Sequence, residues 1–402
     1  MEAYASTTTL VILDVPPGTS ITLDTLAFSS TTNFRGIKFI HDGIHLLTYG
    51  LDKSELGMRN GFFFNARPGN VSAWKWDKNT EQLLPIREQV EGRELQHRLE
   101  SLHPYLTTFQ LPENEGTTWS DLITYITPDI LNRVLPGDWA FTSQTPSTND
   151  EATDRLSSLP SSRAEAVLKF TSVNLKKTFD PHAVGRERTE QILDKSYYLK
   201  TLLQQLPDEL ALLGEFQLSF TTVLYMNNFS GFETWKNLFT VLCGCKAALK
   251  PRERLFRTFL TVLRQQFEVC TEETFNEVLL AGNFVADNLK LLNSSIEELD
   301  PKASALEFSF AQLMLLLGSK FNWDPIYGAA PRKGAVLNDS GFDENGWDRD
   351  EDYAPVVVDI DSDYDDDVDE MDMDVNFEDR GITGAHMDMK TGKMVFGSGP
   401  RN

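Results

Sequence analysis

The sequence has few of the residues that enzymes most often use for chemistry. Of its 402 residues only three are cysteine and six are histidine, and the histidines are scattered along the chain. It contains no G-x-S-x-G, H-E-x-x-H or P-loop pattern, so no known motif for a nucleophile, zinc or a nucleotide is present. We therefore expect a protein that is not an enzyme, with no catalytic residues, no metal ligands and no cofactor.

The chain also lacks long apolar runs. No segment approaches the roughly 18 uninterrupted apolar residues of a membrane span. The first residues, MEAYASTTTLVILDV, have neither the basic start nor the long apolar stretch of a signal peptide. Cys243 and Cys245 form a C-x-C pair without a nearby histidine, which favours free thiols in a reducing compartment over a zinc site. These absences predict a soluble intracellular protein.

Positive charge is scarce. The chain has 37 Lys and Arg against 60 Asp and Glu, a net charge of −23. Residues 339–379 alone hold 19 acidic side chains and one basic one, Arg349, so this segment carries −18 and the rest carries −5. The acidity therefore belongs to a tail. Because such a balance repels nucleic-acid phosphates, we expect no direct binding to nucleic acid.

The N-terminal part is typical of β-structure. Short runs rich in β-branched and aromatic residues alternate with Gly, Pro, Asn and Asp, which predicts a β-sandwich or open barrel. The expected strands are Thr9–Val15, Ile21–Phe28, Gly36–Ile40, Gly43–Tyr49, Gly61–Ala66 and Asn70–Trp76. Helical patterns follow at Glu88–Leu102 and at Trp119–Ile126, where Ser120 is the expected cap.

A segment without periodicity follows. Residues 144–164 are rich in Ser, Thr, Asn, Asp and Pro, which predicts a linker or long loop. The alternation in Ala166–Phe179 then predicts either a late strand of the first domain or a bridge to the second.

Two helical patterns meet at a short polar break. Leu213, Phe216 and Phe220 keep three-and-four spacing, and Phe232, Trp235 and Phe239 resume it after Asn227–Gly231. Two aromatic-rich helices of this kind need further helices around them to bury both faces. Helical patterns run from Thr189 to about Phe321, with caps expected at Asp194–Ser196 and Asp208, and predict five to seven helices.

These patterns predict an α+β protein. We expect a β-rich domain over residues 1–180, with the loop 144–164, a helical domain over 189–325, and an acidic disordered tail over 326–402. Within the tail, Tyr353–Ile360 (YAPVVVDI) is an island of β-branched residues. Such a run can add itself as a strand to the edge of another sheet.

The chain resembles the Aar-two (AAR2) splicing-factor family, whose members are assembly factors for the U-five small nuclear ribonucleoprotein. No single motif is diagnostic, but the matching motifs occur in the family's order over most of the chain. They are FRGIK (Phe34, Arg35, Gly36 and the next two residues), GIH from Gly43, GFFF from Gly61, DKSYYL at 194–199, LGEFQLSF at 213–220 (with Gly214 and Glu215), Trp235–Cys243 and APVVV at 354–358.

The resemblance implies a partner and a mechanism. The partner is the spliceosomal scaffold Prp-eight, bound through its C-terminal RNase-H-like and Jab-one/MPN-like domains, and the family keeps the Brr-two helicase off this scaffold until maturation. The partner-binding strand would map onto Ala354, Pro355, Val356, Val357, Val358, Asp359 and Ile360. We further expect a monomer that binds no membrane and occurs in both cytoplasm and nucleus. This chain departs from the family in its long acidic, Met-rich extension, Asp361–Asn402.

Some single motifs also permit other interpretations. The VVV run followed by acids also suits a segment that binds a SUMO-like modifier, on a helical adaptor of another class. Trp74 and Trp76 share one strand face and could stack bases, but packing in a core is favoured. His41 and His45 are interpreted as turn and strand packing and not as a metal pair, and Gly36 as a close backbone approach or a bulge.

Overall fold

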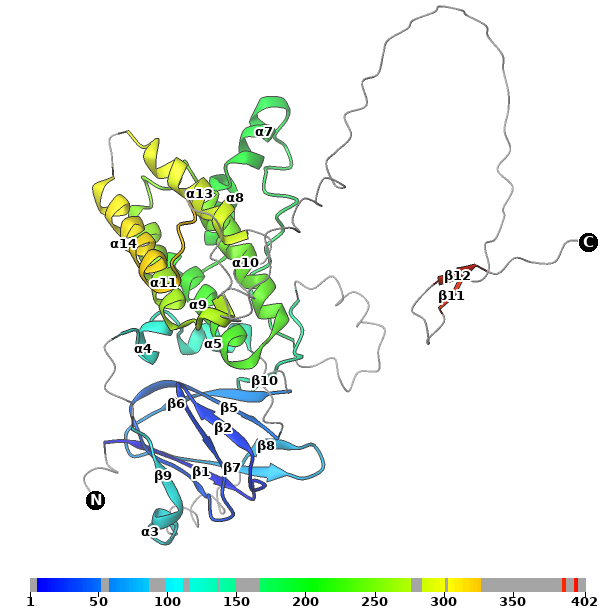
Figure 1. Ribbon diagram of the computed structural model, residues 1–402, viewed down its shortest axis with the longest axis vertical. Helices are drawn as coiled ribbons and strands as arrows, with labels where there is room; N and C mark the ends of the chain where they lie inside the picture. Colours follow the sequence, from blue (N-terminus) through cyan, green and yellow to red (C-terminus); the bar gives the residue numbers. More distant parts are fainter. Residues whose placement is uncertain are drawn as a thin grey trace, which may run out of the picture. The chain divides into compact units, whose positions relative to one another are not determined.

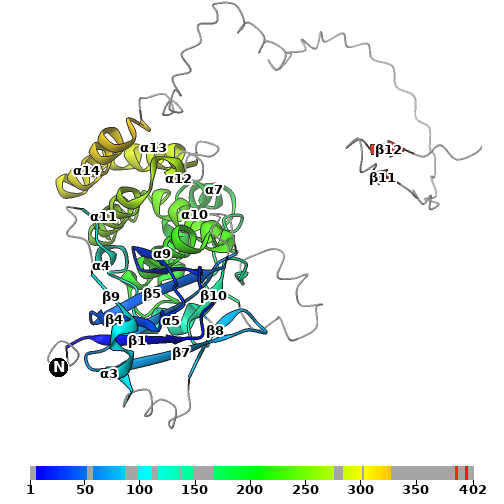
Figure 2. The same ribbon diagram turned by 60° about the horizontal axis from the view of Figure 1, so that its bottom comes forward.

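The computed structural model describes residues 6–51, 58–86, 98–110, 116–135, 137–148, 167–275, 284–300 and 303–326, and the strands 385–387 and 394–396. The chain divides into two units, Met1–Val336 and Leu337–Asn402. In the first unit, strands fill one end and helices the other, as Figures 1 and 2 show. The fold is α+β, as the sequence predicts, with a β-sandwich followed by helices.

The sandwich consists of two five-stranded sheets. The first has the order β8-β7-β1-β4-β9, and the second has the order β10-β6-β5-β2-β3. Strand β1 pairs in parallel with β7, and β4 in parallel with β9, while the other pairs within these sheets are antiparallel. The strands are β1 (Thr8–Leu13), β2 (Ser20–Leu23), β3 (Leu26–Ser29), β4 (Gly36–Ile40), β5 (Gly43–Gly50), β6 (Asn60–Ala66), β7 (Val71–Asp77), β8 (Gln82–Pro85), β9 (Leu106–Thr108) and β10 (Ala140–Thr142).

The second sheet is buried on both faces, which explains the near-continuous apolar run GFFF in β6. Phe62 points into the sandwich, where its ring stacks on that of Trp74 with the centroids 3.6 Å apart. Its neighbour Phe63 faces the other way and packs with Leu46 and Met226 under the helices. Both tryptophans of β7 are only 5% exposed, so Trp74 and Trp76 are core residues, as favoured from the sequence.

The helical half surrounds one central helix. Helix α9 is buried along nearly its whole length because α5, α10 and α11 pack around it. The helices are α3 (Leu99–Leu102), α4 (Trp119–Leu122), α5 (Pro128–Val134), α7 (Gly185–Leu193), α8 (Ser196–Leu203), α9 (Glu209–Met226), α10 (Phe229–Cys243), α11 (Glu253–Val269), α12 (Glu272–Thr274), α13 (Phe284–Glu297) and α14 (Ser304–Phe321), with a 3-10 turn at His103–Tyr105. Among the described residues no helix is long and apolar enough to cross a bilayer.

The predicted hairpin of α9 and α10 is confirmed, with a turn shorter than expected. Asn227 ends α9 in the left-handed conformation, with φ 53°, which asparagine tolerates better than most residues. Asn228 then caps α10 by accepting a hydrogen bond from the amide of Gly231. The predicted cap of α9 is also found, because the Asp208 carboxylate accepts from the amide of Leu210.

Two sequence-based expectations are corrected by the structure. The single strand expected over 21–28 is a hairpin of β2 and β3 that turns at Asp24, where φ is 54°. The cap of α4 is Thr118 and not Ser120, in a reciprocal capping box with Asp121. For the segment 166–179, two alternatives were open, and the described residues do not form the late strand. A single parallel bridge joins Ser147 and Leu168.

In the second unit, two short strands pair in antiparallel register. They are β11 (Ala385–Met387) and β12 (Met394–Phe396), with His386 opposite Val395. They lie within the segment expected to be a disordered tail, and the sequence patterns did not predict them. The island Tyr353–Ile360, which was expected to form a strand, lies outside the described residues.

Candidate functional site at the junction of sheets and helices

The residues expected to bind a partner, 354–360, lie outside the described part of the chain. The motif residues in the folded unit, in contrast, can be followed one by one. They lie in two places, at the β1–β4 edge of the sandwich and at the junction where β6 and the segment 116–135 meet the helices.

At the β1–β4 edge, the FRG motif packs β4 closely against β1 of the sandwich. Phe34 is 6% exposed within the sandwich core. Gly36 has φ 135°, and a Cβ there would lie 2.0 Å from the carbonyl oxygen of Leu10, so β1 and β4 approach too closely for any side chain. The predicted close approach is confirmed. Arg35 donates to the carbonyl of Phe34, which gives its guanidinium a local structural partner. Gly43, with φ 129°, begins β5 immediately after the turn from β4.

His45 is packed in the sandwich, as the sequence favours. Its Nδ1 lies 2.7 Å from the Asp24 carboxylate and its Nε2 lies 2.9 Å from the carbonyl of His41, with Phe64 stacked on the ring at 5.5 Å. Asp24 also accepts from the amide of Leu46. Burial raises the pKa of Asp24, and the contacts with His45 and Leu46 oppose this rise. The pair fixes the β2–β3 turn against β5.

At the junction, two glycines permit helix α9 to contact its neighbours directly. A Cβ on Gly61 of β6 would lie 2.9 Å from the Met226 sulfur at the end of α9. A Cβ on Gly214, within α9, would lie 2.3 Å from the carbonyl oxygen of Tyr125. Side chains at either position would push the helix away from the sheet or from the segment 119–134. The glycine of GFFF therefore sets the spacing between the sheet and α9, and the glycine of LGEF sets the spacing between α9 and the segment 119–134.

Glu215 follows Gly214 and supplies a fully enclosed carboxylate. Its Oε1 accepts from Arg133 Nη2 at 2.6 Å and from the Thr171 hydroxyl at 2.8 Å, and its Oε2 accepts from the Thr171 amide at 2.8 Å. Burial raises the pKa of Glu215, while the Thr171 hydrogen bonds and the Arg133 charge oppose the rise. One side chain thus joins α9 to α5 and to the segment that enters the helical half.

Two amides complete this polar junction. Gln217 accepts from the amide of Tyr125 at 2.7 Å and donates to the carbonyl of Asp121 at 3.1 Å. Asn228 donates its side-chain amide to the carbonyls of Thr142 and Thr145, while its oxygen caps α10. Sequence reasoning missed both side chains, although Asn228 was expected in the turn. Their partners are more than eighty residues away.

A depression opens on the surface beside Glu215. It has a volume of about 500 Å³ and lies between the N-terminal ends of α5 and α9. Its polar lining includes Thr127 and Asp129 on one wall, Asp208 on the other, and Arg133 at the side of Glu215. The Arg133 guanidinium is already paired with Glu215, and Thr127 and Asp208 cap α5 and α9. Three of these four polar side chains therefore serve the fold.

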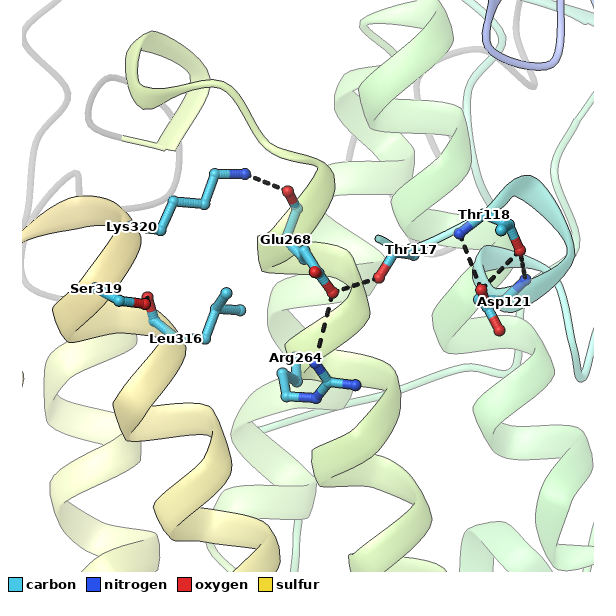
Figure 3. Close-up of polar contacts among 8 residues, drawn as sticks. All are labelled: Thr117, Thr118, Asp121, Arg264, Glu268, Leu316, Ser319 and Lys320. Atoms are coloured by element: carbon cyan, nitrogen blue, oxygen red, sulfur yellow. Dashed lines mark hydrogen bonds and ion pairs between the residues drawn. The ribbon is translucent and has the colours of Figure 1, made fainter. Parts of the chain in front are cut away.

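A second polar cluster joins the loop before α4 to α11 and α14 (Figure 3). The Thr117 hydroxyl donates to the Glu268 carboxylate at 2.6 Å, and Arg264 lies 3.5 Å from the same oxygen. Lys320 of α14 donates to the backbone carbonyl of Glu268. In this cluster Glu268 is the shared partner of three elements, so its role here is to hold the helices and the loop together.

The aromatic helices meet at Trp235, which is fully buried. Its indole donates to Gln266 at 2.9 Å and stacks between Phe216 and Phe239.

The three cysteines are buried free thiols, and burial raises the pKa of each, that of Cys270 to about 12. In the described ranges, no group of three His, Cys, Asp or Glu side chains could hold a metal ion. The motif residues therefore form a scaffold, and the described site shows no reactive arrangement.

Exposed apolar side chains are the remaining feature that calls for an explanation. Helix α7 has no buried residue, and it projects from the helical half in Figure 1. Val184 is 77% exposed, Leu193 70% and Ile192 45%. We call these three residues the α7 patch. They lie at the two ends of α7, Val184 at its N-cap and the other two at its last turn, and exposed apolar side chains of this size are typical of protein-interaction surfaces.

Comparisons with known proteins agree with the resemblance inferred from the motifs. Two family models match the chain in order, the AAR2 N-terminal domain over residues 6–136 and the AAR2 C-terminal repeat region over residues 170–325. The human protein AAR2 homolog is 27% identical over 383 residues, covering 88% of this chain and 93% of its own length. The protein AAR2 homolog of Caenorhabditis elegans is 24% identical, and the match covers 80% of this chain and 95% of the relative's length. The A1 cistron-splicing factor AAR2 of Saccharomyces cerevisiae is 23% identical, and the match covers 87% of this chain and 97% of the relative's length.

Proposed function

This chain belongs to the AAR2 family, and from that premise we propose that it is a splicing factor that acts by binding another protein and not by catalysis. The observation that carries the proposal is the ordered match of both family models, together with a yeast relative whose name describes a splicing factor. The polar residues of the junction support a non-catalytic role. Glu215, Gln217 and Asn228 are all used to hold elements of the fold together.

The proposed partner is the scaffold Prp-eight, and the proposed task is assembly of the U-five particle. The C-terminal RNase-H-like and Jab-one/MPN-like domains of Prp-eight would be held until maturation, while the Brr-two helicase is kept away. The chain is further proposed to occur in both cytoplasm and nucleus. Two features of the chain support binding to a protein surface, namely the tail island and the α7 patch.

The tail island is proposed to add a strand to the partner. Ala354–Ile360 combines three consecutive valines with a proline at its start, so its backbone can pair along a sheet edge while alternate side chains fill pockets. The −18 segment around the island would draw it toward a basic surface, and such attraction weakens as salt screens it.

The α7 patch is proposed as the contact on the folded unit. Side-chain contacts join α7 to the segment that directly precedes it. The Arg188 guanidinium lies 4.1 Å from the Phe179 ring centroid, and Gln191 accepts from the Asp180 amide. A partner that covers Val184 and Leu193 would bury apolar surface that now faces solvent.

Calorimetric titration against the C-terminal region of the matching Prp-eight tests the proposal. The full chain should bind tightly, and the chain that ends at residue 338 should bind more weakly. The shortened chain is a fair comparison because Met1–Val336 is a compact unit by itself. Val356→Ser, Val357→Ser and Val358→Ser together should reproduce the loss. A matched control, Met371→Ser with Met373→Ser, changes the same acidic segment and should bind like the wild type.

The outcomes separate the parts of the proposal. Equal affinity of the full and shortened chains would place the interface on the folded unit, and Val184→Glu should then weaken binding. No binding by either chain would overturn the assignment to Prp-eight. Recovery of a SUMO-like modifier through the valines, with no Prp-eight binding, would favour the adaptor class instead. Added Brr-two should fail to bind Prp-eight while the full chain is present.

A further inference from the structure

Helix α14 has two apolar faces, although only one is used within the fold. The inner face packs on α11 and α13. Its residues are all buried, and they are Leu306, Phe310, Leu313, Leu317 and Phe321. A helix that is apolar all round is normally enclosed on all sides. In both Figure 1 and Figure 2, however, α14 lies at the outer edge of the helical half.

The outer face is an exposed seam of four residues. Phe308 is 64% exposed and Leu315 is 65% exposed, and Ala311 and Gly318 are exposed between and beyond them. Their spacing of three, four and three residues is that of the a and d positions of a coiled coil. No charged residue occurs between Glu307 and Lys320, so the seam is uncharged over its whole length. We call these four residues the outer seam.

The outer seam is complementary to itself. In an antiparallel helix pair each a position faces a d position of the other helix, so Phe308 would face Gly318 and Leu315 would face Ala311. Every layer then combines one large and one small side chain. A Cβ built on Gly318 meets nothing within 4 Å, so the space beside it is open for an incoming ring. A parallel pair would instead place Phe308 against Phe308 and leave a gap between the two glycines.

We propose that the outer seam is the contact between two copies of this chain, which pair through antiparallel α14 helices. The two helix dipoles then oppose each other, and the acidic end of one helix lies level with the basic end of the other. This inference replaces the monomer expected at the outset, and it does not depend on the proposed splicing function.

The size of the seam sets the strength of the contact. The eleven residues of helix from Phe308 to Gly318 span about 15 Å. A contact of this length buries less than the roughly 1,200 Å² typical of stable complexes, so the dimer is a weak one. We expect a dissociation constant on the order of 10–100 μM, which corresponds to a dimer that forms when the chain is concentrated.

Sedimentation equilibrium of the full chain tests the proposal. At concentrations well above that range the average mass should approach twice the 45.4 kDa of one chain. Leu315→Glu should keep the chain monomeric, and its unfolding transition should match the wild type because this side chain faces solvent. Val184→Glu places the same charge on a similarly exposed apolar residue, at the N-cap of α7, and should leave the dimer intact.

A residue swap tests the antiparallel pairing. Ala311→Leu alone would put two leucines in one layer, and Leu315→Ala alone would put two alanines there. Both single variants should dimerise less than the wild type. The double variant restores one large and one small residue in each such layer, and it should regain the dimer.

Cross-linking tests the same pairing independently. A mixture of Ala311→Cys and Leu315→Cys chains should form a mixed disulfide, and neither chain should do so by itself, because cysteines more than about 7 Å apart cannot be bridged. The native thiols are buried and do not interfere. A wild type that stays monomeric at all concentrations, a dimer that persists in Leu315→Glu, or a swap that fails to restore it would overturn the proposal.

Discussion

Arg133 and Glu215 form an ion pair between two helices, with Nη2 and Oε1 2.6 Å apart, and only the arginine reaches solvent. The Glu215 side chain is fully enclosed, while that of Arg133 is 34% exposed. This asymmetry matters because an enclosed charge without its partner costs far more than an exposed one. The two residues should therefore respond differently to substitution.

We predict that Arg133→Met destabilises the protein more than Glu215→Gln does. Without the guanidinium the carboxylate is buried with only Thr171 as its described side-chain partner, and a loss of about 2–3 kcal/mol is expected after allowing for the exposure of Arg133. In Glu215→Gln the amide can still hydrogen-bond to Thr171, and Arg133 can turn to water, so about 1 kcal/mol is expected. Urea unfolding at pH 7 measures both values. A larger loss in Glu215→Gln would contradict the prediction.

The same pair predicts a pH dependence. Burial raises the pKa of Glu215 in the folded protein above its value of about 4.5 in the unfolded chain. The stability that Glu215 contributes is therefore complete below pH 4.5, and it is lost as the pH rises through the pKa of the folded protein. Removing Arg133 raises this pKa further. The destabilisation by Arg133→Met should therefore be smaller at pH 5 than at pH 8, whereas that by Glu215→Gln should not grow with pH. Unfolding curves at the two pH values decide this.

Asp24 offers a second test of buried charge. Asparagine tolerates the φ of 54° at this position, and its oxygen can still accept from the Leu46 amide while its NH₂ faces His45 Nδ1. Asp24→Asn should therefore be close to neutral at pH 7, while Asp24→Ala should lose about 2–3 kcal/mol because both groups lose their partner.

The pKa of Asp24 is raised by burial, so its contribution to stability falls as pH rises above 3.8. Asp24→Asn removes that titration and should flatten the stability profile between pH 4 and 7. Urea midpoints measured at intervals across this range provide the readout. A profile unchanged from the wild type would show that Asp24 does not titrate there.

Sequence patterns predicted the elements better than the contacts between them. Alternating apolar residues located most strands, and the polar break at Asn227 located the α9–α10 turn, because these signals are local. Glu215 was noticed only as part of a motif. Its partners Arg133 and Thr171 are 82 and 44 residues away, and no local pattern reports such a pairing.

The turn at Asp24 was missed because Ile21–Phe28 is rich in β-type residues on both sides of it. In β6 the close approach of Met226 explains why a glycine stands beside three phenylalanines.

The thiols should be unreactive in the folded protein. Cys243, Cys245 and Cys270 are at most 1% exposed, and burial raises the pKa of each, so almost no thiolate is present at pH 8. Ellman's reagent should react slowly or not at all with the native chain. In guanidinium chloride all three thiols should react at once. A thiol that reacts quickly in the native protein would contradict this packing and identify the helix that opens.

Two helix glycines form a matched pair for the last prediction. Gly214 of α9 touches the backbone of Tyr125, whereas Gly318 of α14 faces open space. Alanine is the better helix former by about 1 kcal/mol, so Gly318→Ala should be neutral or stabilising. Gly214→Ala gains the same propensity, but its Cβ would lie 2.3 Å from a carbonyl oxygen that cannot move without shifting the segment 119–134. We expect a net loss of about 1–3 kcal/mol, the usual cost of overpacking. Thermal unfolding of the two variants measures the difference. A Gly214→Ala protein as stable as Gly318→Ala would mean that α9 does not pack closely enough on the segment 119–134 to require a glycine.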